Sequence, residues 1–165
     1  MRKLYRRSAS GRSTWAPLLI GLVSAWFLFR RSQTTSTTPR QTILNTLISL
    51  GVSPRTAEYW VAVSDHETGK WSSDLYTKYH NLFGMKQPLK RATLSKGPTK
   101  ITENGNPFAS FDSDSDSVKD LVLYMKEFHY PMDFSSVDAL ISFMKSKGYF
   151  SDTVERYLKS VKARL

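Results

Sequence analysis

The sequence predicts a mostly helical α+β domain with one small β-hairpin, preceded by a single N-terminal transmembrane helix. Apolar residues recur at helical spacing in five segments between residues 41 and 163. The stretch 87–111 lacks this period and contains Asn104-Gly105, a dipeptide typical of tight hairpin turns. With 165 residues, the chain is long enough for one such domain with a real core and an appendage.

The domain is expected to begin near Gln41, with a first amphipathic helix that ends before residue 51. A second helix is predicted over 54–68. Ser53 suits its N-cap and Pro54 its first helical position, since proline needs no hydrogen bond there. Gly69 is a natural stop, because glycine readily adopts the left-handed conformation that ends a helix.

The remaining elements follow from similar signals. Residues 69–80 are expected to form a short loop or helix, and 87–111 to contain the hairpin. Three further amphipathic helices are predicted over 116–129, 135–147 and 151–163. Most of the domain is therefore helical.

The N-terminal part has a different composition. Residues 1–12 form a basic tail, 13–30 a transmembrane anchor and 31–40 a flexible Ser/Thr-rich linker that leads to the domain at 41–165. The stretch 15–29 has no charge and is flanked by arginines, which can extend their side chains to the membrane surface. A cleaved signal peptide is the alternative, but no small-residue cleavage site precedes the arginines.

Charge is concentrated in the same part of the chain. Residues 1–40 carry eight of the 24 basic residues and no acid, whereas the other 125 residues carry sixteen basic and fourteen acidic residues. The net charge of +10 therefore describes the N-terminus and argues against nucleic-acid binding by the domain. Basic residues are more numerous before the apolar segment than after it, which favours a domain on the outer side.

Glu67 is the candidate general acid. It lies seven residues after Trp60, on the helix face that also carries Val63 and Ser64. A carboxyl group packed against apolar side chains is desolvated, which raises its pKa and lets it donate a proton near neutral pH. The alternative is a solvated carboxylate at the helix end, paired with Lys70.

Four short motifs occur in a fixed order. They are Glu67-Thr68-Gly69 followed by Trp71-Ser72-Ser73, Asn81-Leu82-Phe83-Gly84-Met85-Lys86, Phe108-Ala109-Ser110-Phe111-Asp112-Ser113 and Gly148-Tyr149-Phe150-Ser151-Asp152. In order and spacing these motifs resemble the glucosaminidase family of peptidoglycan hydrolases, glycoside hydrolase family 73. The resemblance covers about residues 57–160. It implies a lysozyme-like fold and cleavage after N-acetylglucosamine.

The resemblance also implies a second catalytic carboxylate on the hairpin. Glu103 is the only acid in residues 87–111 and is the natural candidate, although a polar turn residue is the alternative. Asp65 and Asp74 are the fallback choices. If none is positioned, Glu67 would act as both acid and base, as in a lytic transglycosylase.

Substrate-binding residues are expected near these motifs. In the family, the Asn-Leu-Phe-Gly segment lines the sugar cleft. Aromatic side chains near this segment suit the apolar faces of sugars. In the family, the last motif is followed by a tyrosine that lies beside the active site. That tyrosine corresponds to Tyr157 if the loop here is two residues longer; a core position is the alternative. The expected residues are Trp71, Tyr79, Asn81, Phe83, Gly84, Tyr149 and Tyr157.

No metal or organic cofactor is expected. The chain has no cysteine, and its three histidines lack the spacing of a zinc site. Asp112, Asp114 and Asp116 do not fit a calcium loop, because the required glycine and the twelfth-position glutamate are missing. Acids before an apolar helix instead suit its N-terminus.

The expected function is that of a membrane-anchored peptidoglycan hydrolase that opens the wall locally. Its partners would be glycan strands, the lipid membrane through residues 13–30, and anionic lipid headgroups or packaged genome through the basic tail. The domain would face the periplasm of a bacterium, or act from the internal membrane of a phage virion. The alternative is a module of the same fold that binds the wall without cleaving it.

Overall fold

The computed structural model describes residues 37–165, and the unit from Thr37 to Leu165 is compact. The predicted basic tail, the transmembrane anchor and most of the predicted linker lie outside the described residues. Within residues 37–165, no helix is both long and apolar enough to cross a membrane.

Two helices begin the domain, and both are capped as their sequences suggest. Helix α2 (Pro39–Ser49) starts two residues before the expected position, so residues 39 and 40 belong to the helix and not to the linker. The reason is local: Thr38 is the N-cap, its side chain accepting from the Gln41 N–H, and a proline follows. Helix α3 (Pro54–Thr68) has the predicted bounds and ends at a left-handed Gly69 with φ of 57°.

The β-hairpin is also confirmed. Helix α4 (Asp74–Tyr79) precedes it, and strands β1 (Gly97–Glu103) and β2 (Asn106–Ser110) pair antiparallel. Asn104 and Gly105, with φ of 50° and 78°, form the two-residue turn. Positive φ at both positions matches the twist of the two strands, which explains the strong signal of this dipeptide.

Three helices complete the domain: α5 (Asp114–Glu127), α6 (Val137–Ser146) and α7 (Val154–Lys162). Helix α5 ends two residues before the expected position, because His129 adopts a φ of 56° and the Tyr130 N–H bonds to the Met125 carbonyl. Asp114 and Asp116 lie in the first turn of α5, where acidic side chains interact favourably with the helix dipole.

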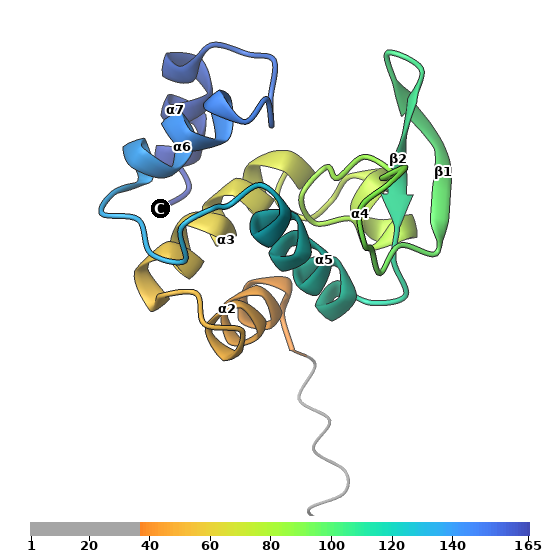
Figure 1. Cartoon of the computed structure of the whole chain (residues 1–165), viewed down its shortest axis with the longest axis horizontal. Helices are drawn as coiled ribbons and strands as arrows, with labels where there is room; N and C mark the ends of the chain where they lie inside the picture. Colours follow the sequence, from red (N-terminus) through yellow and green to blue (C-terminus); the bar gives the residue numbers. More distant parts are fainter. Residues whose placement is uncertain (1–36) are drawn as a thin grey trace, which may run out of the picture. The chain divides into compact units, whose positions relative to one another are not determined.

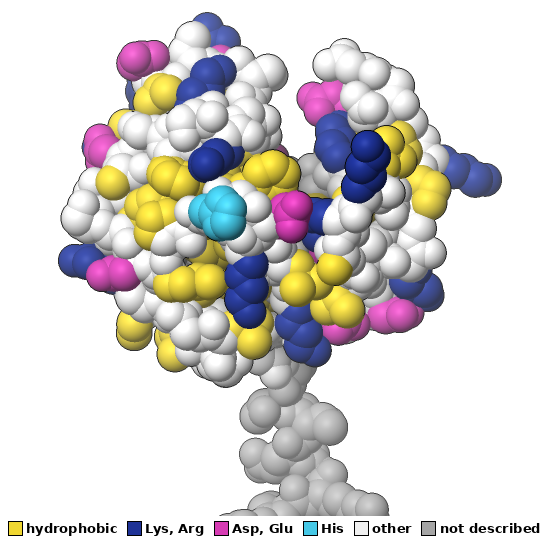
Figure 2. Space-filling model, viewed as in Figure 1, with side chains coloured by type: hydrophobic (Ala, Val, Ile, Leu, Met, Phe, Trp, Pro, Cys, Tyr) yellow, Lys and Arg dark blue, Asp and Glu magenta, His cyan; other side chains and the backbone are white. Residues whose placement is uncertain are grey.

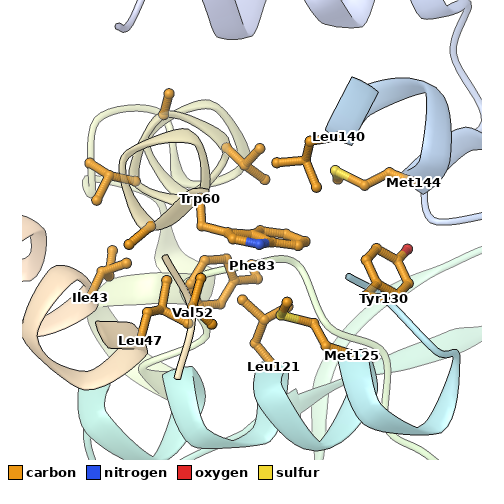
Figure 3. Close-up of a cluster of buried hydrophobic side chains, with 14 of the residues drawn as sticks. Ile43, Leu47, Val52, Trp60, Phe83, Leu121, Met125, Tyr130, Leu140 and Met144 are labelled. Atoms are coloured by element: carbon orange, nitrogen blue, oxygen red, sulfur yellow. The ribbon is translucent and has the colours of Figure 1, made fainter. Parts of the chain in front are cut away.

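Trp60 of α3 lies in the middle of the hydrophobic core (Figure 3). It is fully buried and meets Phe83 edge-on at 6.0 Å between ring centroids. The core around it draws on α2, α5, α6 and the segments that follow α2 and α5, through Ile43, Leu47, Val52, Leu121, Met125, Tyr130, Leu140 and Met144. Burial of each large side chain contributes roughly 1.5–3 kcal/mol, so this cluster fixes the helices around α3.

The arrangement of the elements positions the site. Helix α3 contacts α2, α6 and α7, while the hairpin lies on the other side and contacts α4 (Figure 1). The C-terminal end of α3 therefore lies between the α6–α7 pair and the hairpin. The predicted class, a mostly helical α+β domain with one small β-hairpin, is confirmed.

Candidate active site

A cleft of about 920 Å³ opens beside the end of α3. Figure 2 shows the hollow between the part of the domain that contains α6 and α7 and the part that contains the hairpin. Its lining draws on the end of α3, the segment 83–91, the hairpin, the end of α5, the segment 148–152 and α7. The lining includes Glu67, Phe83, Gly84, Glu103, Tyr149 and Tyr157, six of the nine residues expected at the site.

Glu67 lies in this cleft, and its carboxyl group is held from one side. The Tyr157 hydroxyl, on α7, donates a hydrogen bond to Glu67 Oε1 at 2.5 Å. Burial raises the pKa of Glu67, the hydrogen bond from Tyr157 lowers it in part, and the negative charge of Glu103 raises it. Burial is the largest of these effects, so the pKa of Glu67 lies above its ordinary value.

Gly84 lies close to the other oxygen of Glu67. A Cβ added at Gly84 would lie 3.0 Å from Glu67 Oε2, and the residue has a φ of +60° that other residues rarely adopt. Both the conformation and the close approach therefore require glycine at this position.

Asn81 holds the turn that carries Gly84. Its side chain is fully buried and donates to the carbonyls of Met85 and Ala109, both at 2.9 Å, while its Oδ1 accepts from the Met85 N–H at 2.9 Å. These bonds satisfy the polar groups of the turn and link it to strand β2. Asn81 does not line the cleft, and its observed contacts shape the segment that does.

Tyr157 is fixed by two rings. Phe150 stacks on it with centroids 3.9 Å apart and planes 8° apart, and His66 meets it edge-on at 4.7 Å. Tyr157 is 4 % exposed, and burial together with the nearby Glu67 raises the pKa of its phenol. The hydroxyl thus stays protonated and remains a donor to Glu67.

Tyr149 braces the segment that forms the floor of the cleft. Its hydroxyl donates to the Phe83 carbonyl at 2.7 Å, one residue before Gly84. Its ring packs near Trp60, with centroids 6.1 Å apart. Tyr149 therefore connects the core to the backbone beside the acid.

Glu103 ends strand β1 and lines the cleft from the hairpin side. Its Oε2 forms an ion pair with Lys86 Nζ at 2.7 Å, and Nζ also lies 3.4 Å from the centroid of the Phe108 ring. Lys86 and Phe108 are joined by a β-bridge, so the cation is held between the hairpin and the Asn81–Lys86 motif. A carboxylate therefore lies at the hairpin wall of the cleft, on the element where the family resemblance implies a second acid.

Two of the expected aromatic residues lie elsewhere. Trp71 packs against the core, and its indole N–H donates to Ser64 Oγ at 3.1 Å. Tyr79 ends α4, where its carbonyl accepts from the Phe111 N–H. Neither side chain lines the cleft.

One wall of the cleft depends on a buried ion pair that the sequence did not signal. Asp120 of α5 is fully buried and bonds Arg91 Nη2 at 2.5 Å, the Thr93 hydroxyl at 2.7 Å and the Leu94 N–H at 2.9 Å. These three contacts fasten the segment 87–95 to α5, and Arg91 itself lines the cleft.

Other cleft residues were also missed by the sequence analysis. His66 and Phe150 support Tyr157, and Lys86 holds Glu103. The motifs that contain Phe150 and Lys86 pointed to the region, but only the fold shows what each side chain touches. Within residues 37–165, no group of three His, Cys, Asp or Glu side chains is arranged to hold a metal ion.

The site is a largely buried carboxyl group at the edge of an open cleft in a mostly helical α+β domain. A sequence model of the glucosaminidase family, described as mannosyl-glycoprotein endo-beta-N-acetylglucosaminidase, matches residues 49–164. The chain belongs to this family, which confirms the predicted resemblance and the prediction of a glycosidase. No curated protein matches the sequence.

Two solved structures are similar. One is a type VI secretion system effector–immunity complex from Pseudomonas protegens, with a TM-score of 0.56, 19 % identity, and coverage of 76 % of this chain and 86 % of that chain. The other is the catalytic domain of the autolysin Auto from Listeria monocytogenes, with a TM-score of 0.49, 15 % identity, and coverage of 86 % and 91 %. The first likeness supports the fold.

Proposed function

We propose that this protein is a peptidoglycan hydrolase that cleaves β-1,4 glycosidic bonds of the glycan strand in the manner of an N-acetylglucosaminidase. The observation that carries the proposal is Glu67, a carboxyl group whose pKa is raised by burial and which lies in the cleft of a glucosaminidase-family fold. A raised pKa favours the protonated form, which can give its proton to a leaving glycosidic oxygen.

The contacts of Glu67 decide which oxygen carries the proton. Tyr157 is a donor to Oε1, so the acid proton resides on Oε2. This is the oxygen beside Gly84, a residue with no side chain of its own. In the proposed reaction a glycosidic oxygen approaches Glu67 at this oxygen.

Glu103 is suited to complete the displacement. In the proposed reaction Glu67 gives its proton to the glycosidic oxygen as the bond from that oxygen to the anomeric carbon breaks. A water attacks the anomeric carbon and passes a proton to Glu103, which leaves Glu67 ionised and Glu103 neutral until solvent restores both. Lys86 keeps the Glu103 carboxylate at the hairpin wall before substrate enters.

The cleft also suits a chain of sugars. Its lining includes four aromatic residues, a residue type that packs well on the apolar faces of pyranose rings: Phe108, Tyr124, Phe128 and Phe150. Phe128 is 39 % exposed, so part of this aromatic surface is open before any ligand arrives. A volume of about 920 Å³ lies at the upper end of typical ligand sites and leaves room for several sugar units.

The test compares the full-length chain with the same chain carrying Glu67→Gln on purified peptidoglycan, following turbidity and released reducing ends. Activity in the first and near-complete loss in the folded variant would support the proposal. New N-acetylglucosamine reducing ends identify a glucosaminidase, N-acetylmuramic acid ends a muramidase, and 1,6-anhydro ends a lytic transglycosylase. Equal activity in both chains would refute Glu67 as the acid, and binding without cleavage would favour the wall-binding module.

We further propose that residues 13–30 anchor the enzyme in a membrane, with residues 1–12 contacting anionic headgroups or packaged genome. The support is the uncharged stretch between arginines and the absence of acids in residues 1–40. The domain would face the periplasm of a bacterium or act from the internal membrane of a phage virion, the setting that we favour. Co-flotation of the full-length chain with anionic vesicles, lost when residues 13–30 are deleted, tests the anchor.

A further inference from the structure

His66 is a cleft residue that the proposed reaction does not use. It precedes Glu67 on α3, and its ring lines the same cleft. One ring nitrogen, Nδ1, lies 2.9 Å from the Ser160 hydroxyl on α7. For the other, Nε2, no hydrogen-bond partner is found within residues 37–165, and His66 is partly exposed.

The neighbours of Ser160 favour one tautomer of His66. Arg164 Nη1 lies 3.0 Å from Ser160 Oγ, and a guanidinium can only donate, so Ser160 Oγ accepts this bond. The Ser160 hydroxyl keeps one proton to donate, and the acceptor that it meets within residues 37–165 is His66 Nδ1. Donation to Nδ1 gives that proton a partner, which favours the neutral ring with its own proton on Nε2.

The chain of contacts behind His66 is itself anchored. Arg164 Nε pairs with Asp65 Oδ1 at 2.8 Å, and Arg164 Nη1 also donates to the Ser160 carbonyl. Both partners of this ion pair are largely buried, with side-chain exposures of 23 % and 18 %. Burial and the positive charge of Arg164 lower the pKa of His66, while the negative charges of Asp152 and Asp65 raise it by a smaller amount. The neutral ring is thus the form that this setting favours.

We propose that His66 is a substrate-binding residue, which donates a hydrogen bond from Nε2–H to an oxygen of the sugar chain beside Glu67. The suitable ligand atom is a hydroxyl or acetamido carbonyl oxygen, since the proton on Nε2 makes it a donor. The inference rests on the proposed function, because it places a glycan in the same cleft. Arg164 and Ser160 would act through His66 by setting which nitrogen of its ring carries the proton.

His66 also packs on Tyr157, so the experiment must separate the hydrogen bond from the packing. His66→Gln keeps a donor near the position of Nε2 but loses the ring, whereas His66→Phe keeps a ring against Tyr157 but loses the donor. Both are made in the full-length chain carrying Glu67→Gln, for which the proposed function predicts binding without turnover. The dissociation constant is then measured for solubilised glycan strands of peptidoglycan, after thermal melts confirm folding.

We expect His66→Phe to weaken binding about three- to tenfold, the loss for one neutral hydrogen bond, and His66→Gln to stay within about twofold of its parent. Ser160→Ala, which releases the tautomer, falls between them. Unchanged binding by His66→Phe overturns the inference, as does equal weakening by both variants. If the wild type hydrolyses peptidoglycan but His66→Phe leaves binding unchanged, only this inference is refuted. If binding depends on His66 but the wild type hydrolyses nothing, only the proposed function is refuted.

Discussion

Gly84→Ala tests the close approach between the Asn81–Lys86 motif and the acid. The added methyl group would lie 3.0 Å from Glu67 Oε2 and 3.7 Å from Glu67 Cδ, closer than ordinary van der Waals contact for the oxygen. Alanine at a φ of +60° costs about 1–2 kcal/mol of stability, which corresponds to a fall of about 3–8 °C in Tm for a domain of this size.

The effect on activity should be much larger than the effect on stability. The methyl group either displaces the carboxyl group or covers the oxygen that carries the proton. Misplacing a catalytic group by about 1 Å costs about 100-fold in rate, so kcat/KM for peptidoglycan should fall by about that factor. Thermal melts and initial rates of reducing-end release measure the two quantities.

Gly51→Ala is the matched control. Gly51 also has a positive φ, +92°, but a Cβ there meets nothing within 4 Å. It should lose Tm by a similar or greater amount and keep the kcat/KM of the wild type. If the two variants have the same kcat/KM, the contact with Glu67 has no role in catalysis and the argument from Gly84 fails.

Three further predictions follow from the site and its walls. Tyr157→Phe removes the hydrogen bond that lowers the pKa of Glu67, so the basic limb of the pH profile of kcat/KM should move to higher pH; a limb that stays in place would contradict this role. At pH values above 4.5, the ordinary carboxyl pKa, Glu67→Gln should raise Tm, and at lower pH it should have little effect. The folded state holds the Glu67 proton more tightly than the unfolded state does, so the wild type loses stability as pH rises through the raised pKa. Calorimetry across this range gives the sign, and a gain that is largest in acid would refute it. Arg91→Met leaves the buried Asp120 without its cation and should lower the free energy of unfolding, measured in urea melts, by about 3–5 kcal/mol. A loss below about 1 kcal/mol would show that the buried Asp120 tolerates the removal of Arg91.

The local features of the fold could be predicted because they depend on neighbouring residues. Ser53, Pro54 and Gly69 determine the ends of α3 through capping geometry alone, and Asn104-Gly105 specifies the hairpin turn. The position of Glu67 also followed from helical periodicity. These signals act within a few residues, so one sequence is enough to see them.

The destinations of aromatic side chains could not be predicted in the same way. Trp71 and Tyr157 are both aromatic residues close to a motif, yet one packs beside Ser64 and the other contacts Glu67. What separates them is the docking of α7 onto α3, a contact between residues far apart in sequence. The bond from Arg91 to Asp120 depends on tertiary packing in the same way, since charge alone does not say which acid an arginine will meet.

The pairing of Glu67 with Tyr157 joins residues 90 positions apart, one on α3 and one on α7. During translation the ribosome completes the acid long before it makes the tyrosine that orients it. A chain interrupted between these two helices would carry Glu67 without its donor and without the ring of Tyr157 beside His66. The hydrogen bond that holds the Glu67 carboxyl group therefore forms only after synthesis has passed α7 and that helix has docked on α3.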